Sequence, residues 1–147
     1  MPEIAVRVFQ SMKKIILPGI IAGFLMLIAG ILFNFLTNLA FPSIAKEYTS
    51  GLMRPWSDPL MMIFFLYPFI LSFVLAWAWD KSKKLFKGSA CRRGAMFALS
   101  IFLISSIPGM FVTYTSFNVS FGMVLSWTVS GLIYLLIAGC VFARMNK

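Results

Sequence analysis

Four long apolar runs dominate the chain, and each is long enough to cross a lipid bilayer as a helix. A membrane-spanning helix needs about 20 predominantly apolar residues to cross about 30 Å of hydrocarbon. The pattern predicts an all-α integral membrane protein, a four-transmembrane-helix bundle that forms a single membrane domain over residues 1–147. The predicted spans cover about residues 15–35, 60–79, 95–114 and 121–142, with an external loop at 36–59 and a basic loop at 80–94.

Lysine and arginine gather at every second junction between these spans. Eleven of the 13 cationic residues lie in the N-terminal segment, in the 80–94 loop or at the C-terminus, whereas the external loop holds only Lys46 and Arg54. By the positive-inside rule, this asymmetry predicts that the N-terminus, the basic loop and the C-terminus are cytoplasmic. We expect the basic loop to contact anionic lipid head groups at the cytoplasmic face of the lipid bilayer.

Composition excludes an ordinary soluble domain. The chain is 61% hydrophobic and 12% charged, with a mean hydropathy of +0.93, whereas soluble domains are about half apolar and a quarter charged. The net charge of +9 therefore favours membrane anchoring, and we expect no nucleic acid partner. The chain has no histidine, and Cys91 and Cys140 lie far apart in the sequence. We therefore expect no metal site and no cofactor.

The central parts of the predicted spans carry no ionisable side chain. Such side chains mark proton relays and ion pathways in membrane proteins, so their absence argues against a proton-coupled exporter. It also separates this chain from the small multidrug exporters, whose first helix carries a glutamate. The vitamin K epoxide reductase family is excluded because the chain has no C-x-x-C pair.

Uncharged polar side chains and two prolines, Pro68 and Pro108, gather in the outer halves of the spans. One interpretation is a ligand recess that opens to the outside and is closed on the cytoplasmic side. The alternative is that these groups bond helices together and compensate for the prolines, which leave the carbonyls of Phe64 and Ile104 without their usual donors. The recess candidates are Asn34, Tyr67, Ser105, Ser106, Thr113, Tyr114 and Ser126.

Small residues recur at helical spacing in the first and fourth spans, where they would let helix backbones approach closely. The partner helix could belong to the same chain or to a second copy. The helix-packing candidates are Gly19, Gly23, Gly30, Gly122, Ser126 and Ser130.

The external loop contains the candidates Glu47, Arg54, Trp56 and Asp58, in a segment that Pro55 and Pro59 stiffen. One hypothesis makes this loop an interfacial lid over the outer recess. The other gives each residue a local role: Trp56 anchors at the interface, Asp58 caps the second span, and Arg54 pairs with Glu47 or a lipid phosphate.

Three functional classes follow from these patterns. The first is a non-enzymatic binder or transporter of a small uncharged or lipid-like molecule in the outer recess. The second is a structural or accessory subunit, with a homo-oligomer or another membrane protein as partner. The third is an interfacial lipid-modifying enzyme that uses Glu47 and Asp58. We expect a multi-pass protein of a prokaryotic cytoplasmic membrane.

Overall fold

A computed structural model describes residues 2–51 and 53–147, with side chains from Met12 onward. Over these residues the chain is helical and contains no strand, so the predicted all-α fold class is confirmed. The elements in order are α1 (Pro2–Ala40), α2 (Pro42–Tyr48), η1 (Pro59–Leu66), α3 (Tyr67–Ser82), η2 (Lys83–Leu85), α4 (Ala90–Ile101), η3 (Phe102–Ser106), α5 (Ile107–Ser116) and α6 (Phe121–Met145).

Four helical stretches of the described chain are long and apolar enough to cross a membrane. They cover Met12–Ala40, Pro59–Leu85, Ala90–Ser116 and Phe121–Met145. The helix α1 continues to Ala40, and α2 then occupies part of the predicted external loop. The protein is thus a small multi-pass helical membrane protein.

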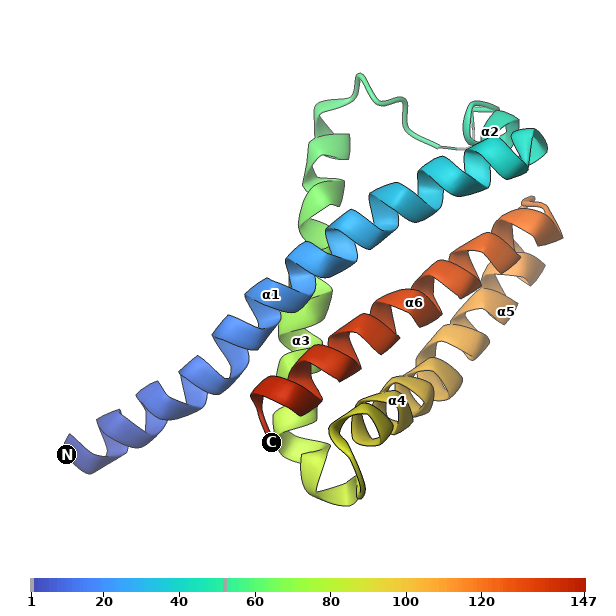
Figure 1. The fold of residues 1–147 in the computed structure, drawn as a ribbon. Coiled ribbons are helices and arrows are strands. Elements are labelled where there is room, and N and C mark those ends of the chain that lie inside the picture. Colours follow the sequence, from blue (N-terminus) through green and yellow to red (C-terminus); the bar gives the residue numbers. More distant parts are fainter. Residues whose placement is uncertain (1, 52) are drawn as a thin grey trace.

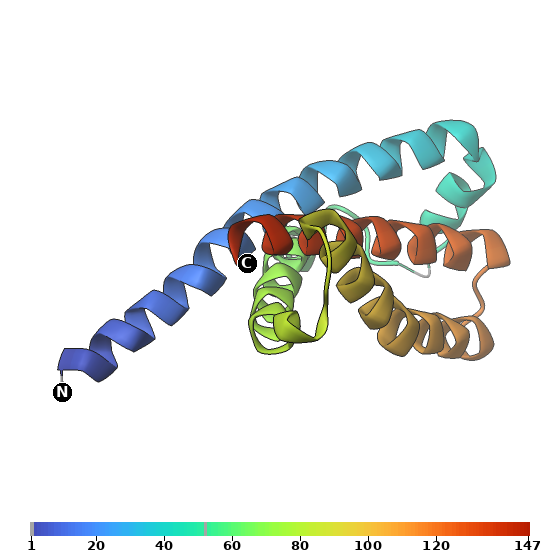
Figure 2. The same cartoon turned by 60° about the horizontal axis from the view of Figure 1, so that its bottom comes forward.

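The helices α1 and α6 lie side by side and form the centre of the bundle (Figure 1). The helix α3 packs mainly against α1, whereas α4 packs mainly against α6. A short connection joins α3 to α4. From it, α3 and the helices α4 and α5 run apart in both views (Figures 1 and 2). We call the end with residues 80–94 and the C-terminal residues 144–147 the basic end, and the opposite end the α2 end.

The apolar core lies towards the basic end. Trp79 is fully buried and contacts the rings of Phe86 and Phe97, with ring centroids 6.0 and 5.4 Å apart. The guanidinium of Arg93 lies 5.3 Å from the centroid of the Trp79 ring. The other core residues are Ala22, Met26, Leu75, Ala76, Ala98, Leu135, Ala138, Phe142 and Ala143.

Asn146 closes this end by bonding to four residues from three elements, α1, α3 and η2. Its side-chain amide donates to the Asp80 carboxylate at 3.0 Å and to the Lys14 carbonyl at 3.3 Å. Its own backbone carbonyl accepts from the Trp79 indole at 2.8 Å, and its side-chain oxygen accepts from Lys83. Asn146 therefore joins Lys14 of α1 to the end of α3 and to η2 at the basic end.

Glycines set the closest helix contacts. A Cβ atom at Gly94 would stand 2.6 Å from the Gly139 carbonyl carbon, so α4 and α6 approach as closely as their backbones allow. On α1, Gly19 and Gly23 face the rings of Phe73 and Phe69 of α3. The buried Ser72 hydroxyl donates to the Gly19 carbonyl at 2.7 Å. Gly30 faces Tyr134 of α6, and Gly122 makes only an ordinary contact with Ile44.

Prolines change the helix type in two of the spans. Proline lacks a backbone donor, so the carbonyl four residues earlier loses its usual helical partner. Before Pro68 the chain forms the 3-10 helix η1, in which the Tyr67 N–H donates to the Phe64 carbonyl. The Phe64 carbonyl thus accepts a backbone bond from the residue three positions later, so it needs no hydroxyl or water as a partner. Before Pro108 the chain forms the π segment η3, in which the Ile107 N–H donates to Phe102.

Candidate functional site

The helix α2 folds back onto the start of α6 and fastens the α2 end. The Glu47 carboxylate accepts from the backbone N–H of Ser120 at 2.6 Å, and Ser120 is the N-cap residue of α6. The Trp127 indole donates to the Tyr48 hydroxyl at 2.6 Å. Ile44 is buried beneath these contacts. Two polar bonds and an apolar anchor therefore hold the loop after α1 against α6.

Burial keeps the Tyr48 phenol protonated. Burial is the largest influence and raises the pKa of the phenol, and the charge of neighbouring Glu47 raises it further. The hydrogen bond from Trp127 offsets part of this increase. The hydroxyl therefore remains neutral across the physiological pH range.

A recess of about 240 Å³ lies beside this contact. Its walls come from the segment after α2, the last turn of α5, the α5–α6 loop and the second turn of α6. The lining residues are Met53, Thr113, Phe117, Val119 and Trp127. The Thr113 hydroxyl donates to Gly109 within its own helix, and the Trp127 indole is engaged by Tyr48. The lining is therefore uncharged and almost wholly apolar.

Of the recess residues predicted from the sequence, only Thr113 lines this hollow. Asn34 accepts from Asn38 at 2.9 Å on the surface of α1. The rings of Tyr67 and Tyr114 pack against neighbouring phenylalanines, with centroids 6.3 and 5.9 Å apart. Ser105 and Ser106 lie in η3, exposed and half-buried respectively, and Ser126 is half-buried on α6. The Ser130 hydroxyl donates to the carbonyl of Trp127.

Four residues of the recess were not predicted from the sequence: Met53, Phe117, Val119 and Trp127. Trp127 carried the clearest signal, because an indole N–H within an apolar span needs an acceptor. Its acceptor, Tyr48, belongs to a loop distant in sequence. The sequence could therefore indicate that Trp127 needs a partner but could not identify which residue provides it.

The remaining loop candidates form a separate local turn. The Asp58 carboxylate accepts from the Leu60 N–H at 2.9 Å, which confirms the predicted helix cap, and pairs with Arg54 at 2.8 Å. The prediction that Arg54 pairs with Glu47 is wrong, because the tight Pro55–Pro59 turn brings Asp58 within reach. The Leu60 N–H and then Arg54 lower the pKa of Asp58. Trp56 is exposed beside Phe65.

Glu47 and Asp58 therefore engage different partners, and neither is held against the other. Among the side chains that the structure describes, from Met12 onward, no cluster of three or more His, Cys, Asp or Glu residues could hold a metal ion.

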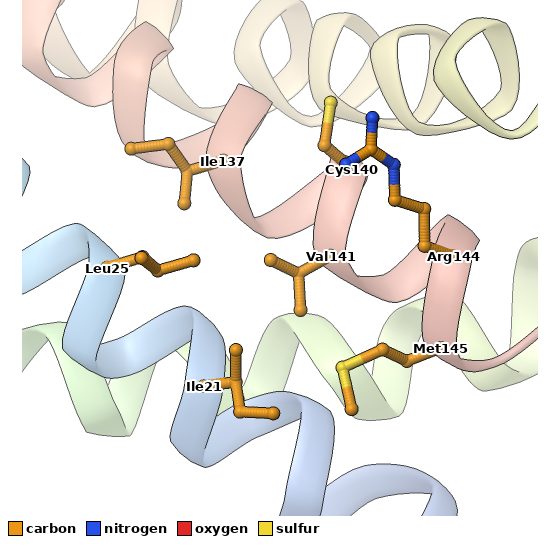
Figure 3. A pocket seen from close by; sticks show the side chains of 7 residues that line it. All are labelled: Ile21, Leu25, Ile137, Cys140, Val141, Arg144 and Met145. Atoms are coloured by element: carbon orange, nitrogen blue, oxygen red, sulfur yellow. The ribbon is translucent and has the colours of Figure 1, made fainter.

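A second hollow runs between α1 and α6 at the basic end (Figure 3). Its volume is about 340 Å³, and it is lined by Ile21, Leu25, Ile137, Cys140, Val141, Arg144 and Met145. Figure 3 shows the aliphatic side chains converging between the two helices, whereas the Arg144 guanidinium folds back beside Cys140. Apart from the Arg144 guanidinium, the groove is lined by apolar side chains and Cys140.

No protein-family model, curated protein or solved structure matches the chain. The fold defines the class, a small multi-pass helical membrane protein.

Proposed function

We propose that the protein is a binder or transporter of a small uncharged or lipid-like molecule, which it takes up in the recess at the α2 end. The uncharged lining of the 240 Å³ recess is the observation that carries this proposal. Ligand sites of membrane and soluble proteins combine apolar walls with a few fixed polar groups. Here the walls are Phe117, Val119 and Met53, and the polar groups of the lining itself, the Thr113 hydroxyl and the Trp127 indole, are neutral.

The distribution of packing also favours a site at this end. The core residues lie towards the basic end, whereas η1 and α5 contribute no buried residue. Taking the basic end as cytoplasmic, as the charge asymmetry indicates, the recess would face outward. Two contacts, of Glu47 with Ser120 and of Tyr48 with Trp127, would hold α2 in place. Met53, which follows α2, would then form one wall of the recess.

A variant that fills the recess provides the test. Wild type, Val119→Trp and Val112→Trp would be purified in mild detergent and compared by native mass spectrometry with extraction of bound molecules. Val119 lines the recess, whereas Val112 is an exposed residue of α5 and serves as the matched control. We expect a retained uncharged molecule in wild type and Val112→Trp, and its loss from Val119→Trp.

The smaller substitution Val119→Phe keeps the test valid if Val119→Trp fails to fold, as judged by helicity and elution volume. Retention of the same molecule by every folded recess variant would contradict the proposal. So would wild-type protein that carries no small molecule under conditions that preserve lipid contacts.

The alternative function is that of an accessory subunit. It is favoured by α5, whose residues are all at least partly exposed although they lie in an apolar span. Another membrane protein could cover the side that includes Phe111 and Val112. In the same native spectra, this alternative predicts a stoichiometric protein adduct that Val112→Trp disrupts and Val119→Trp retains.

A further inference from the structure

The two cysteines, far apart in the sequence, meet where α4 crosses α6. A Cβ atom at Gly94 would stand 2.9 Å from the backbone nitrogen of Cys140, which places Cys140 at the point of closest approach. Cys91 lies three residues before Gly94 on α4, and residues three apart occupy the same side of a helix. The close glycine contact therefore directs Cys91 towards the segment of α6 that carries Cys140.

The side chains occupy the positions that this backbone geometry predicts. Cys91 and Cys140 lie close enough for their side chains to influence each other, and both cysteines are free. The sequence spacing gave no sign of this pairing, because the contact depends on the α4–α6 crossing. A pair of adjacent thiols in one chain is the arrangement needed for intramolecular thiol–disulfide exchange.

The two thiols differ in their access to solvent. Cys91 is exposed in the first turn of α4, next to Arg92, whereas Cys140 is half-buried. The guanidinium of Arg144 lies beside Cys140 (Figure 3). An oxidant arriving from water would therefore meet Cys91 first, with Cys140 behind it as the second thiol.

We infer that Cys91 and Cys140 form a reversible thiol–disulfide site whose oxidant is a small-molecule disulfide. The Cys91 sulfur, having lost its proton, attacks one sulfur of the oxidant, whose S–S bond breaks and whose leaving thiolate takes up a proton. The Cys140 sulfur, having lost its proton, then attacks the Cys91 sulfur of the mixed disulfide. The bond from Cys91 to the small molecule breaks, and the leaving thiolate takes up a proton to become the second small thiol. Two protein thiols are oxidised, and one small disulfide is reduced to two thiols.

The oxidised site would link α4 covalently to α6 beside the contact of Gly94 with Gly139. In a reducing compartment it would remain a dithiol. This site does not depend on the recess at the α2 end, and its chemistry can be tested without knowing the bound molecule.

The test oxidises the full-length purified protein in detergent micelles with glutathione disulfide. Free thiols are counted by maleimide labelling, and the intact mass distinguishes an internal disulfide from glutathione adducts. We expect wild type to lose both thiols and two hydrogens, without a retained adduct or a crosslinked dimer. A reducing agent should restore both thiols, and Cys91→Ser or Cys140→Ser should keep one glutathione.

A double variant, Cys140→Ser with Val141→Cys, provides the matched control. It retains two cysteines but moves one thiol to the α1-facing groove that Val141 lines. Adjacent thiols react at a high effective concentration. Wild type should therefore form its internal disulfide at a glutathione disulfide concentration about tenfold or more below the one that this control needs. Equal oxidation of both proteins, or two stable glutathione adducts on wild type, would overturn the inference.

Discussion

Asn146 donates to the backbone carbonyl of Lys14 at 3.3 Å, and this carbonyl is the one that Pro18 leaves without its helical donor. A side chain from the last residues of the chain thus replaces the missing hydrogen bond near the beginning of the first span. The same amide also donates to Asp80, so the repair is part of the network that closes the basic end.

The first prediction concerns this repair. Asn146→Ala should lower the free energy of unfolding by about 1–3 kcal/mol, because buried groups lose their partners. The cost should be smaller in a Pro18→Ala background, where the residue at position 18 again supplies an N–H to Lys14. Denaturant titration in detergent of wild type, Asn146→Ala, Pro18→Ala and the double variant measures this coupling. Lys147→Ala, at an exposed neighbouring position, is the control. An identical cost of Asn146→Ala in both backgrounds would contradict the assigned role.

The second prediction concerns the crossing of α4 and α6. Gly94→Ala or Gly139→Ala should destabilise the bundle by about 1–3 kcal/mol, because the added methyl meets the backbone of the other helix and forces the helices apart. At Gly109 an added Cβ meets nothing within 4 Å, so Gly109→Ala should have little effect. Thermal melting in one detergent compares the three variants. Equal melting temperatures would show that the crossing accommodates a methyl group.

The third prediction concerns Ser72, whose buried hydroxyl joins α3 to the Gly19 carbonyl of α1. Ser72→Ala should cost about 0.6–1.7 kcal/mol, the range found for hydrogen bonds between membrane helices. Ser100→Ala is the matched control, because the Ser100 hydroxyl bonds only to Met96 of its own helix. Chemical unfolding should separate the two variants. If Ser100→Ala were as costly as Ser72→Ala, the bond between helices would contribute nothing of its own.

The fourth prediction uses the lowered pKa of Asp58. A carboxyl whose pKa is lowered in the folded protein stabilises it above the unfolded pKa, and this contribution is lost as pH falls through the folded pKa. Asp58→Asn keeps a capping side chain but removes the charge. Wild type should therefore melt at a higher temperature than Asp58→Asn near neutral pH, and the gap should shrink as pH falls below 4. Asp58→Ala, which also removes the cap, should keep a deficit in acid. A pH-independent gap for Asp58→Asn would exclude a contribution from the charge.

The spans were predictable because a length of about 20 apolar residues is a local property of the sequence. The cap at Asp58 was predictable for the same reason, since both of its partners lie within four residues. Gly94 and Gly139 were not recognised, although Ala98 and Ala143 follow each of them at four-residue spacing. Such pairs are common, and only the helix crossing distinguishes the ones that touch.

The residues of the recess were also only partly predictable from the sequence. Thr113 was identified because it is polar within an apolar span. Met53 and Val119 are unremarkable in the sequence, and their role depends on how α2 fastens to α6. The bond between Glu47 and Ser120 joins segments far apart in the sequence, and nothing in either segment specifies the other.

The eight residues of the 3-10 helix η1 also affect how the second span is oriented. A 3-10 helix turns about 120° per residue, compared with about 100° in an α-helix. Over eight residues the accumulated difference is about 160°, nearly half a turn. A helical wheel drawn from α3 through Pro68 therefore misplaces Phe64 by about 60° and assigns residues near the start of η1, such as Leu60, to the wrong side of the span. A cysteine-accessibility scan along residues 59–82 should show a break in its periodicity at Tyr67.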